Sequence, residues 1–237
     1  MIELENFTIG YQQRFLLKDV STQFPSKSLT ALIGRNGCGK STLLKTICRL
    51  SDNYRGEIFI DGENIRNISG NRLSEKIAYV NPMRPRIANL KCKDIVALGR
   101  SPYTNWHGKL SADDHIRIKR SISLVKMESY EDRYFNSLSD GESQKIMIAR
   151  AIAQDTEIII LDEPTSFLDL PTRYELVELL KKLTEENEKT IIYSTHELDL
   201  ALKKSDYVAL MESGKLYNLP ASEMADSDIL SHLIQPQ

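Results

Sequence analysis

The sequence has few of the features that mark secreted or membrane-spanning proteins. Its 237 residues include three cysteines, Cys38, Cys48 and Cys92. They are too few and too irregularly spaced for a disulfide framework or a zinc site, and they suit a reducing compartment. The longest aliphatic runs, such as Ile158 to Leu161, are far shorter than a membrane span, and the first residues lack the basic patch and apolar run of a signal peptide. We therefore expect a cytoplasmic protein that reaches a membrane only through a partner.

A strong charge of one sign is also missing. The formal net charge is -2 and the pI about 6.1, so the chain as a whole lacks the basic field of a nucleic-acid-binding protein. Locally, residues 81–120 hold nine Lys or Arg against three Asp, which would suit an anionic membrane surface. Arg100, Tyr103 and Trp106 are of types favoured at protein contacts. This stretch is either a docking face or a solvated basic loop whose tryptophan fills a local core.

Strand and helix patterns alternate along most of the chain. Short alternating segments fill residues 2–24, and a buried strand over residues 29–34 leads through a glycine-rich loop into a helix over residues 40–49. Further strands are expected at residues 56–62, 76–80, 157–161, 190–194 and 207–211, and further helices at residues 141–154, from 171, and at 198–203. Residues 81–136 show helical patterns and little strand pattern. The alternation predicts an α/β fold with parallel strands and a helical insertion.

The glycine-rich loop GRNGCGKST, Gly34 to Thr42, satisfies the phosphate-loop pattern in full. Gly34 and Gly39 let the backbone amides point inward around a phosphate, Lys40 reaches the terminal phosphates, and the Ser41 hydroxyl can bind magnesium. A chance glycine turn is the alternative, but a strand before the loop and a helix after it favour nucleotide binding. The loop predicts a nucleotide without saying which reaction follows.

Two other predicted strands end in polar residues. Asp162 and Glu163 follow the strand at residues 157–161, at the kind of strand end where open α/β sheets bind ligands. One acid can hold magnesium, and Glu163 can then orient or deprotonate a water for attack on a γ-phosphate. Capping of the turn before Pro164 is the alternative for the pair. His196 follows the strand at residues 190–194 in the same way, although a lone histidine is more often a structural hydrogen-bonding group.

A second helix start also suits an anion. In NSLSDGESQKIMIAR, Asn136 to Arg150, Ser139 and Gly141 open a stretch whose apolar residues continue at helical spacing. Small residues and free amides at a helix start favour negative charge. The chain therefore has two helix N-termini that are suited to binding a phosphate.

Four elements in this order, GRNGCGKST, LSDGESQ, IIILDEPTSFLD and STHE, resemble the ATP-binding subunits of ABC transporters. The likeness covers nearly the whole chain, and the LSDGE element separates this family from other phosphate-loop proteins. Gly99 to Asp114 is similar to a segment of the importer ATPases for iron-siderophore, haem and cobalamin uptake. The resemblance implies one ABC ATPase domain. Its phosphate-loop NTPase core and N-terminal antiparallel β subdomain would fill residues 1–80 and 155–237, and its helical signature subdomain residues 81–154.

The resemblance also implies how ATP is held. In this family two ATPase domains meet head to tail, and each ATP lies between the phosphate loop of one and the signature helix of the other, which accounts for the second helix start. Glu163 would be the catalytic base, His196 would contact the γ-phosphate, and Ser41 and Asp162 would hold Mg²⁺. The other ATP-binding residues would be Tyr11 against adenine, Ser139 and Gly141 in trans, Asp169 across the dimer interface, and Gly34, Arg35, Asn36, Gly37, Cys38, Gly39, Lys40, Ser41 and Thr42.

The implied assembly is a homodimer bound to a membrane permease at the inner face of the cell membrane. A substrate-binding protein would take part only indirectly, and nucleic acid is not an expected partner. The implied function is ATP-driven import of an iron-siderophore, haem or cobalamin-type substrate. A soluble ABC ATPase acting on nucleic acid or in cofactor assembly is the alternative, and an exporter ATPase is a third possibility.

Three positions depart from the usual family pattern. The family has a glutamine after the strand at residues 76–80, where this chain has Asn81 and Pro82, which puts the hydrolysis rate and coupling in question. The LSDGE element carries Asp140, whose carboxylate we expect to point outward and cap the helix. Cys38 lies within the phosphate loop, where it fits as a small residue.

Overall fold

The computed structural model describes residues 1–11, 14–83, 85, 89–105 and 107–230. The chain divides into two compact units. Unit 1 comprises residues 1–69 and 180–237, and unit 2 comprises residues 70–179. The boundaries predicted for the core and the helical subdomain stay a prediction.

An antiparallel sheet forms the N-terminal part of unit 1. Its order is β2-β1-β4-β5, with β1 (Ile2–Tyr11), β2 (Arg14–Phe24), β4 (Tyr54–Ile60) and β5 (Glu63–Asn64). The buried side chains of β1 are Ile2 and Leu4, then Phe7 and Ile9, so the alternation slips by one residue. The register shifts between Leu4 and Phe7, and this irregularity keeps both apolar pairs on the core face.

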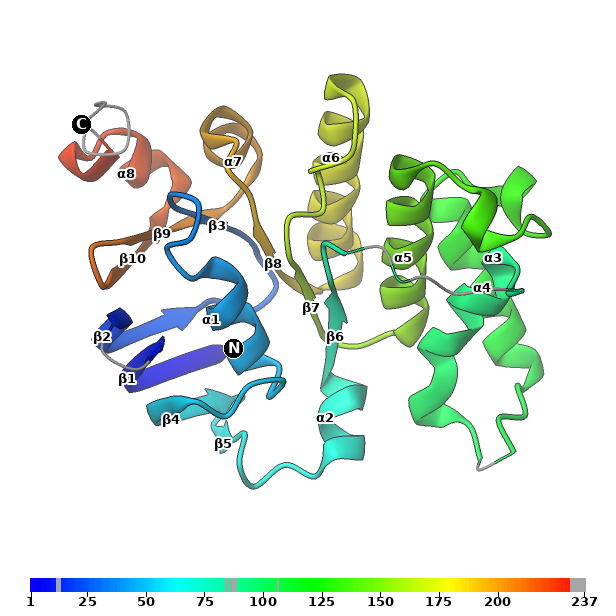
Figure 1. The fold of residues 1–237 in the computed structure, drawn as a ribbon, viewed down its shortest axis with the longest axis horizontal. Helices are drawn as coiled ribbons and strands as arrows, with labels where there is room; N and C mark the ends of the chain where they lie inside the picture. The colour runs from blue at the N-terminus through cyan, green and yellow to red at the C-terminus, as the bar shows by residue number, and fades with distance from the viewer. Residues whose placement is uncertain (12–13, 84, 86–88, 106, 231–237) are drawn as a thin grey trace. The chain divides into compact units, whose positions relative to one another are not determined.

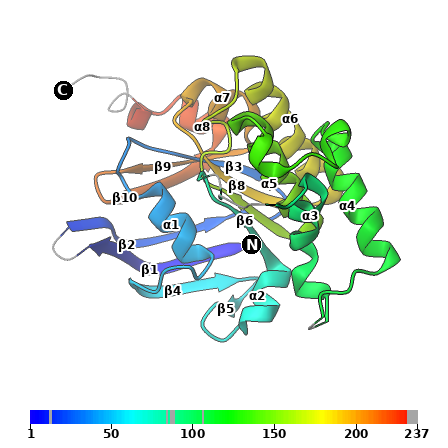
Figure 2. The same cartoon turned by 45° about the vertical axis from the view of Figure 1, so that its right-hand side comes forward.

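The second group of strands in unit 1 has the order β10-β9-β3-β8. β3 (Leu29–Ile33) runs parallel to β8 (Thr190–Ser194) and β9 (Tyr207–Glu212), and β10 (Lys215–Pro220) is antiparallel to β9. All residues of β3 and β8 are buried, as in parallel strands covered on both faces. Helices α7 (Leu198–Lys204) and α8 (Ala221–Ala225) cover one face, and α1 (Lys40–Ile47) lies between the other face and the antiparallel sheet (Figures 1 and 2).

Unit 2 pairs two parallel strands, β6 (Ile77–Val80) and β7 (Ile158–Leu161), with a group of helices. In Figure 1, α3 (Cys92–Ala97), α4 (Ala112–Leu124) and α5 (Asp140–Gln154) lie side by side. The remaining elements are α2 (Gly70–Lys76) and the 3₁₀ helices η1 (Leu98–Tyr103), η2 (Glu128–Tyr130) and η3 (Phe135–Ser137). Helix α6 (Leu170–Asn187) begins in unit 2 and ends in unit 1, where η4 (Asp228–Leu230) also lies.

The predicted fold class is confirmed, with parallel strands, an N-terminal antiparallel sheet and a helical part. The expected strands and helices are present with small changes at their ends. The sequence patterns did not predict α2, β5, β10, α8 or the 3₁₀ helices. The sequence KLYNLP of β10 gives little strand pattern because it contains Asn and Pro, and the strand forms by pairing with β9 across the turn at Ser213 and Gly214.

Candidate nucleotide-binding site

The phosphate loop connects β3 to α1 through a backbone path that requires glycine. Gly34 and Gly39 have φ values of 156° and 110°, which side chains rarely allow. A Cβ atom on Gly34 would lie 2.6 Å from the Met211 carbonyl oxygen and 2.8 Å from Cys38 Sγ. The loop is therefore packed directly against the end of β9, and a larger residue at position 34 would displace it.

The start of α1 is open toward an anion. Gly39 is its N-cap residue, no side chain caps the helix, and its first turn holds no acidic residue. The first amides of α1 and the positive end of the helix dipole are thus not offset by a carboxylate of the helix itself. Lys40 is 5% exposed, and its Nζ donates to the Gly34 carbonyl oxygen at 2.8 Å. The ammonium group is held over the loop, where a phosphate would meet it.

His196 reaches the same sheet edge as the phosphate loop. β3 and β8 are parallel neighbours in register from Leu29 with Ile191 to Leu32 with Ser194. The ladder continues with Thr195, whose N–H donates to the Leu32 carbonyl oxygen at 3.0 Å. The next residue, His196, is exposed. The expected convergence of these two strand ends is therefore present within unit 1, and the role of His196 stays a prediction.

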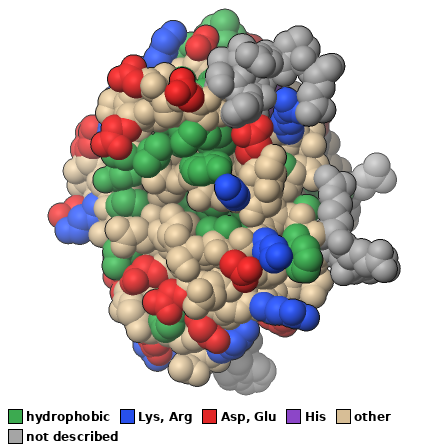
Figure 3. Space-filling model, turned by 90° about the vertical axis from the view of Figure 1, so that its left-hand side faces the viewer, with side chains coloured by type: hydrophobic (Ala, Val, Ile, Leu, Met, Phe, Trp, Pro, Cys, Tyr) green, Lys and Arg blue, Asp and Glu red, His purple; other side chains and the backbone are tan. Residues whose placement is uncertain are grey.

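A pocket of about 480 Å³ opens beside the phosphate loop. Phe15 and Leu16 of β2, Cys38 of the loop, Met211 of β9, and Lys18 and Lys215 are among its lining residues. Figure 3 views the molecule from the side that lies at the left of Figure 1 and shows hydrophobic side chains gathered near the middle of that face. The pocket thus joins an apolar floor to an anion-binding loop. Tyr11 ends β1, and its side chain lies outside the described part of the structure.

In unit 2, Asp162 and Glu163 follow β7 as predicted. Asp162 is fully buried, its N–H donates to the Val80 carbonyl oxygen at 3.0 Å, and its Oδ2 accepts a hydrogen bond from the Tyr79 hydroxyl at 3.3 Å. Glu163 has a left-handed backbone with φ 49°, and its Oε2 accepts a hydrogen bond from Ser166 Oγ at 3.0 Å. The two carboxylates therefore have different surroundings, one within the strand ladder and one in the turn that follows.

The second helix start differs from the first because it is already capped. Ser139 is the N-cap of α5. Its hydroxyl accepts from the Glu142 N–H at 3.3 Å, and the Glu142 carboxylate accepts from the Ser139 N–H at 2.8 Å. The Ser139 amide lowers the pKa of Glu142, and the Tyr130 hydroxyl contributes. The expectation that Asp140 caps the helix is wrong. Asp140 is the first helical residue, and its negative charge interacts favourably with the positive end of the helix dipole.

Two further predicted residues make local hydrogen bonds. Asp169 accepts the Thr172 N–H at 3.2 Å at the start of α6, and hydrogen bonding by the Thr172 hydroxyl, followed by its amide, lowers the pKa of Asp169. The Asn81 side chain accepts the Met83 N–H at 3.0 Å, which is an Asx-type turn. Each of these side chains thus fixes the backbone of the two or three residues that follow it.

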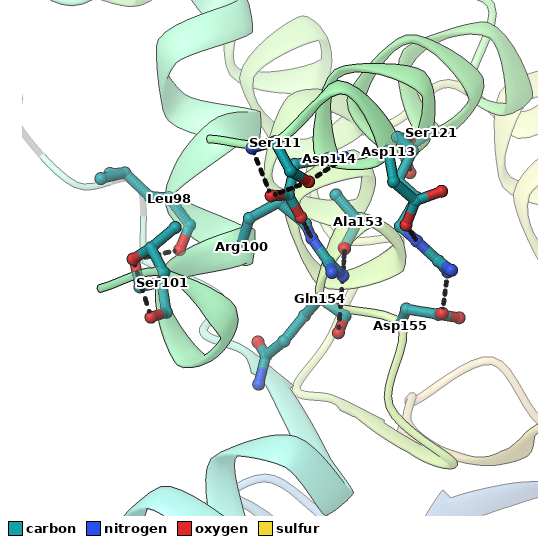
Figure 4. Close-up of polar contacts among 12 residues, drawn as sticks. Leu98, Arg100, Ser101, Ser111, Asp113, Asp114, Ser121, Ala153, Gln154 and Asp155 are labelled. Atoms are coloured by element: carbon teal, nitrogen blue, oxygen red, sulfur yellow. Dashed lines mark hydrogen bonds and ion pairs between the residues drawn. The ribbon is translucent and has the colours of Figure 1, made fainter. Parts of the chain in front are cut away.

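The expectation that Arg100 faces a partner is wrong. Arg100 is 5% exposed. Its Nε donates to Asp114 Oδ1 at 2.7 Å, and its NH1 group donates to the Ala153 carbonyl oxygen at 2.9 Å (Figure 4). Tyr103 lies against it, with the guanidinium carbon 4.1 Å from the ring centroid. The guanidinium joins η1, α4 and the end of α5, which is a packing role. Trp106 lies outside the described residues.

The basic excess of residues 81–120 is also partly neutralised. Lys91 and Lys93 both pair with Asp132, and Arg117 pairs with Asp113 and Asp155. Because Asp132 and Asp155 lie outside the stretch, counting charges along the sequence overstated its positive field.

The sequence patterns did not single out Tyr79 and Ser166, which donate hydrogen bonds to Asp162 and Glu163 respectively. Tyr79 is 83 residues from Asp162, so only the pairing of β6 with β7 brings it there. Ser166 is three residues from Glu163, and a hydroxyl so close to an acid after a strand was a local signal that could have been used.

Unit 1 has a buried Lys beside a glycine loop and an uncapped helix start, and unit 2 has two carboxylates after a buried strand. These features define a phosphate-loop nucleotide-binding protein. Residues 17–166 match the ABC transporter family, and the chain belongs to that family. It is an ATPase of the ATP-binding cassette type.

The similarity to known relatives and to solved structures extends over almost the whole chain. The chain is 36% identical to the petrobactin import ATP-binding protein YclP of Bacillus subtilis (strain 168) over 234 residues, covering 98% of this chain and 92% of the relative. It is 33% identical to the iron(3+)-hydroxamate import ATP-binding protein FhuC of the same organism, covering 99% and 87%. The dimeric structure of MJ0796, a bacterial ABC transporter cassette, matches with a TM-score of 0.81 and 29% identity, covering 93% of this chain and 99% of that one.

Proposed function

We propose that this ATPase powers an importer for an iron-siderophore, haem or cobalamin-type substrate, working as a head-to-tail homodimer on a separate membrane permease. The observation that carries the proposal is similarity over nearly the full length to ATPases named for the import of petrobactin and iron(3+)-hydroxamate. None of the described helices is both long and apolar enough to cross a membrane. In this proposal the permease supplies the path through the membrane, at whose inner face the ATPase works.

In the proposed site, the amides of the phosphate loop and the Lys40 ammonium bind the β- and γ-phosphates. The open start of α1 supports this role, because nothing on the helix itself competes for its amides. The adenosine end of ATP occupies the pocket beside Cys38, whose floor includes Leu16 and Met211. This apolar floor suits a base, and the loop at its rim suits the phosphates.

Hydrolysis in this proposal uses Glu163 to orient and deprotonate a water, with His196 at the γ-phosphate. The donor set fits Mg²⁺, which Ser41 and Asp162 would hold, because Mg²⁺ is usually bound by one or two carboxylates and by substrate phosphates. No group of three or more His, Cys, Asp or Glu in the described ranges is arranged to hold a metal ion by itself, which suits an ion shared with the nucleotide. When bound, Mg²⁺ neutralises charge that develops on the phosphate oxygens.

Ser139 and Gly141 serve the partner's ATP in the proposed dimer. Because Asp140 and Glu142 lie in the same helical turn, a phosphate approaching this start must overcome their repulsion. We therefore expect the hydroxyl of Ser139 and the backbone near Gly141 to make the contact. Asp169 lies at the start of α6 and would reach across the same interface.

The permease is tested by photo-crosslinking in native membranes. Met83 is 75% exposed and follows Asn81 and Pro82, where the family links to its membrane partner. A photoreactive residue at position 83 should capture a polytopic membrane protein, identified by mass spectrometry. The same residue at position 50, where Leu50 is 62% exposed in unit 1, is the control. Capture of only soluble proteins from position 83 would contradict the importer proposal and favour a soluble ABC ATPase.

A further inference from the structure

The segment after Glu163 turns back onto the Glu163 side chain. The Ser166 N–H donates to the Glu163 carbonyl oxygen at 3.2 Å, and Ser166 Oγ donates to Glu163 Oε2 at 3.0 Å. One residue thus binds both the backbone and the carboxylate of Glu163. The left-handed φ of 49° at Glu163 is sparsely populated by residues with a side chain, and such conformations are found at functional sites when their surroundings fix them.

We infer that Ser166 is a positioning residue for Glu163, an inference that rests on the proposed role of Glu163 as the base. A glutamate side chain has three rotatable bonds, and a base must hold its carboxylate within hydrogen-bond reach of one water. An ionised carboxylate only accepts hydrogen bonds, so the Ser166 hydroxyl is the donor in this pair. The bond restricts the Glu163 side chain to conformations that keep Oε2 at the Ser166 hydroxyl, so the carboxylate is held in one place relative to the turn.

The turn itself does not depend on the Ser166 hydroxyl. Leu168 N–H donates to the Thr165 carbonyl oxygen at 3.2 Å, the Leu168 side chain is 5% exposed, and Arg173 Nε donates to the Leu168 carbonyl oxygen at 2.7 Å. These contacts use the backbone and the apolar side chain of the segment. Replacing Ser166 by alanine should therefore remove the contact to the carboxylate and leave the backbone of the turn in place.

The structure offers a matched control for this change. Ser123 Oγ donates to Glu128 Oε1 at 2.6 Å, which is also a serine-to-glutamate hydrogen bond in unit 2. Neither Ser123 nor Glu128 is among the residues of the proposed ATP site. Ser123→Ala removes the same kind of bond without touching Glu163, so it measures what such a loss does by general destabilisation.

The test compares steady-state ATP hydrolysis, ATP binding and thermal unfolding across these variants. Ser166→Ala should lower kcat about tenfold, with KM for ATP within about twofold and an unchanged unfolding midpoint, as expected for a group that acts only on the orientation of the base. Ser166→Thr, which keeps a hydroxyl, should recover most of the rate. Ser123→Ala should match the parent. Parental kcat in Ser166→Ala, or no recovery in Ser166→Thr, would overturn the inference.

Testing Ser166→Ala in a Glu163→Gln variant as well distinguishes a failure of the positioning role from a failure of the proposed base. In single-turnover assays, Glu163→Gln alone should lose nearly all hydrolysis, and adding Ser166→Ala should cause no further loss because Ser166 acts through the Glu163 carboxylate. An equal loss in both backgrounds would assign Ser166 an independent role and refute positioning. Hydrolysis at the parental rate in Glu163→Gln would instead refute the base assignment itself, whatever Ser166→Ala does.

Discussion

Replacing Asp114 by asparagine should loosen the helical part of unit 2, whereas the same change at the adjacent Asp113 should not. Asp114 pairs with Arg100 at 2.7 Å, with side chains 7% and 6% exposed. Asp113 pairs with Arg117 at the same distance, but those side chains are 65% and 40% exposed. The two substitutions are chemically identical and lie next to each other on α4. They differ in burial and in the capping hydrogen bonds that Asp114 accepts from the Ser111 amide and hydroxyl.

The magnitudes follow from that difference in burial. Removing one partner of a buried pair costs about 3–5 kcal/mol because the other charge stays buried, and we take about 3 kcal/mol since asparagine keeps an acceptor oxygen. An exposed pair contributes only about 0.2–1 kcal/mol. At 1.4 kcal/mol per tenfold, the loss at position 114 corresponds to about a hundredfold more frequent local opening.

Hydrogen exchange followed by mass spectrometry measures this opening directly. Peptides that cover η1 and α4 should exchange about a hundredfold faster in Asp114→Asn and less than about fivefold faster in Asp113→Asn. Peptides from β3 and β8 in unit 1 serve as an internal reference. Equal effects of the two substitutions would refute the argument that the buried Arg100 guanidinium depends on Asp114.

Protonation of Asp114 at low pH should also remove the stabilisation that this carboxylate provides. Hydrogen bonds from the Ser111 hydroxyl and amide, and then the Arg100 guanidinium, lower the pKa of Asp114 to about 2. Since this folded-state pKa lies below the unfolded value of about 3.9, the stabilisation is complete above about pH 4 and is lost as the pH falls through 2. From these two pKa values the stabilisation amounts to about 2.6 kcal/mol. The difference in unfolding free energy between the parent and Asp114→Asn should therefore shrink between about pH 4 and 2.

Two further variants probe the proposed dimer and the packing of unit 2. Glu163→Gln should still bind ATP and accumulate as a closed dimer in size-exclusion chromatography with light scattering, because binding precedes the step it blocks; a monomer with bound ATP would count against this. Gly99→Ala should lower the free energy of unfolding by about 1–3 kcal/mol or more, because its Cβ would overlap the Arg150 carbonyl oxygen. Gly70→Ala is the control, since a Cβ there meets no atom within 4 Å, and equal urea midpoints would contradict the packing argument.

The sequence by itself determined the phosphate loop and the type of fold. Gly34 and Gly39 allow the backbone conformations that the loop requires, and Lys40 follows at the start of a helix that has no acidic residue in its first turn. These features are local, so the order of residues is enough to predict them. Alternating strand and helix patterns likewise predicted parallel strands, because each pattern reports which face of its own segment is buried.

Only the tertiary structure decided which partner each polar side chain takes. Arg100 looked like a contact residue in the sequence, yet it is buried against Asp114, 14 residues away, and against the end of α5, 53 residues away. Tyr79 reaches Asp162 because β6 pairs with β7. At the start of α5, sequence position allowed Asp140 or Ser139 to cap, and the backbone geometry selected Ser139 with Glu142. A side chain's partner depends on how distant segments pack, and packing is not a property of any one stretch of sequence.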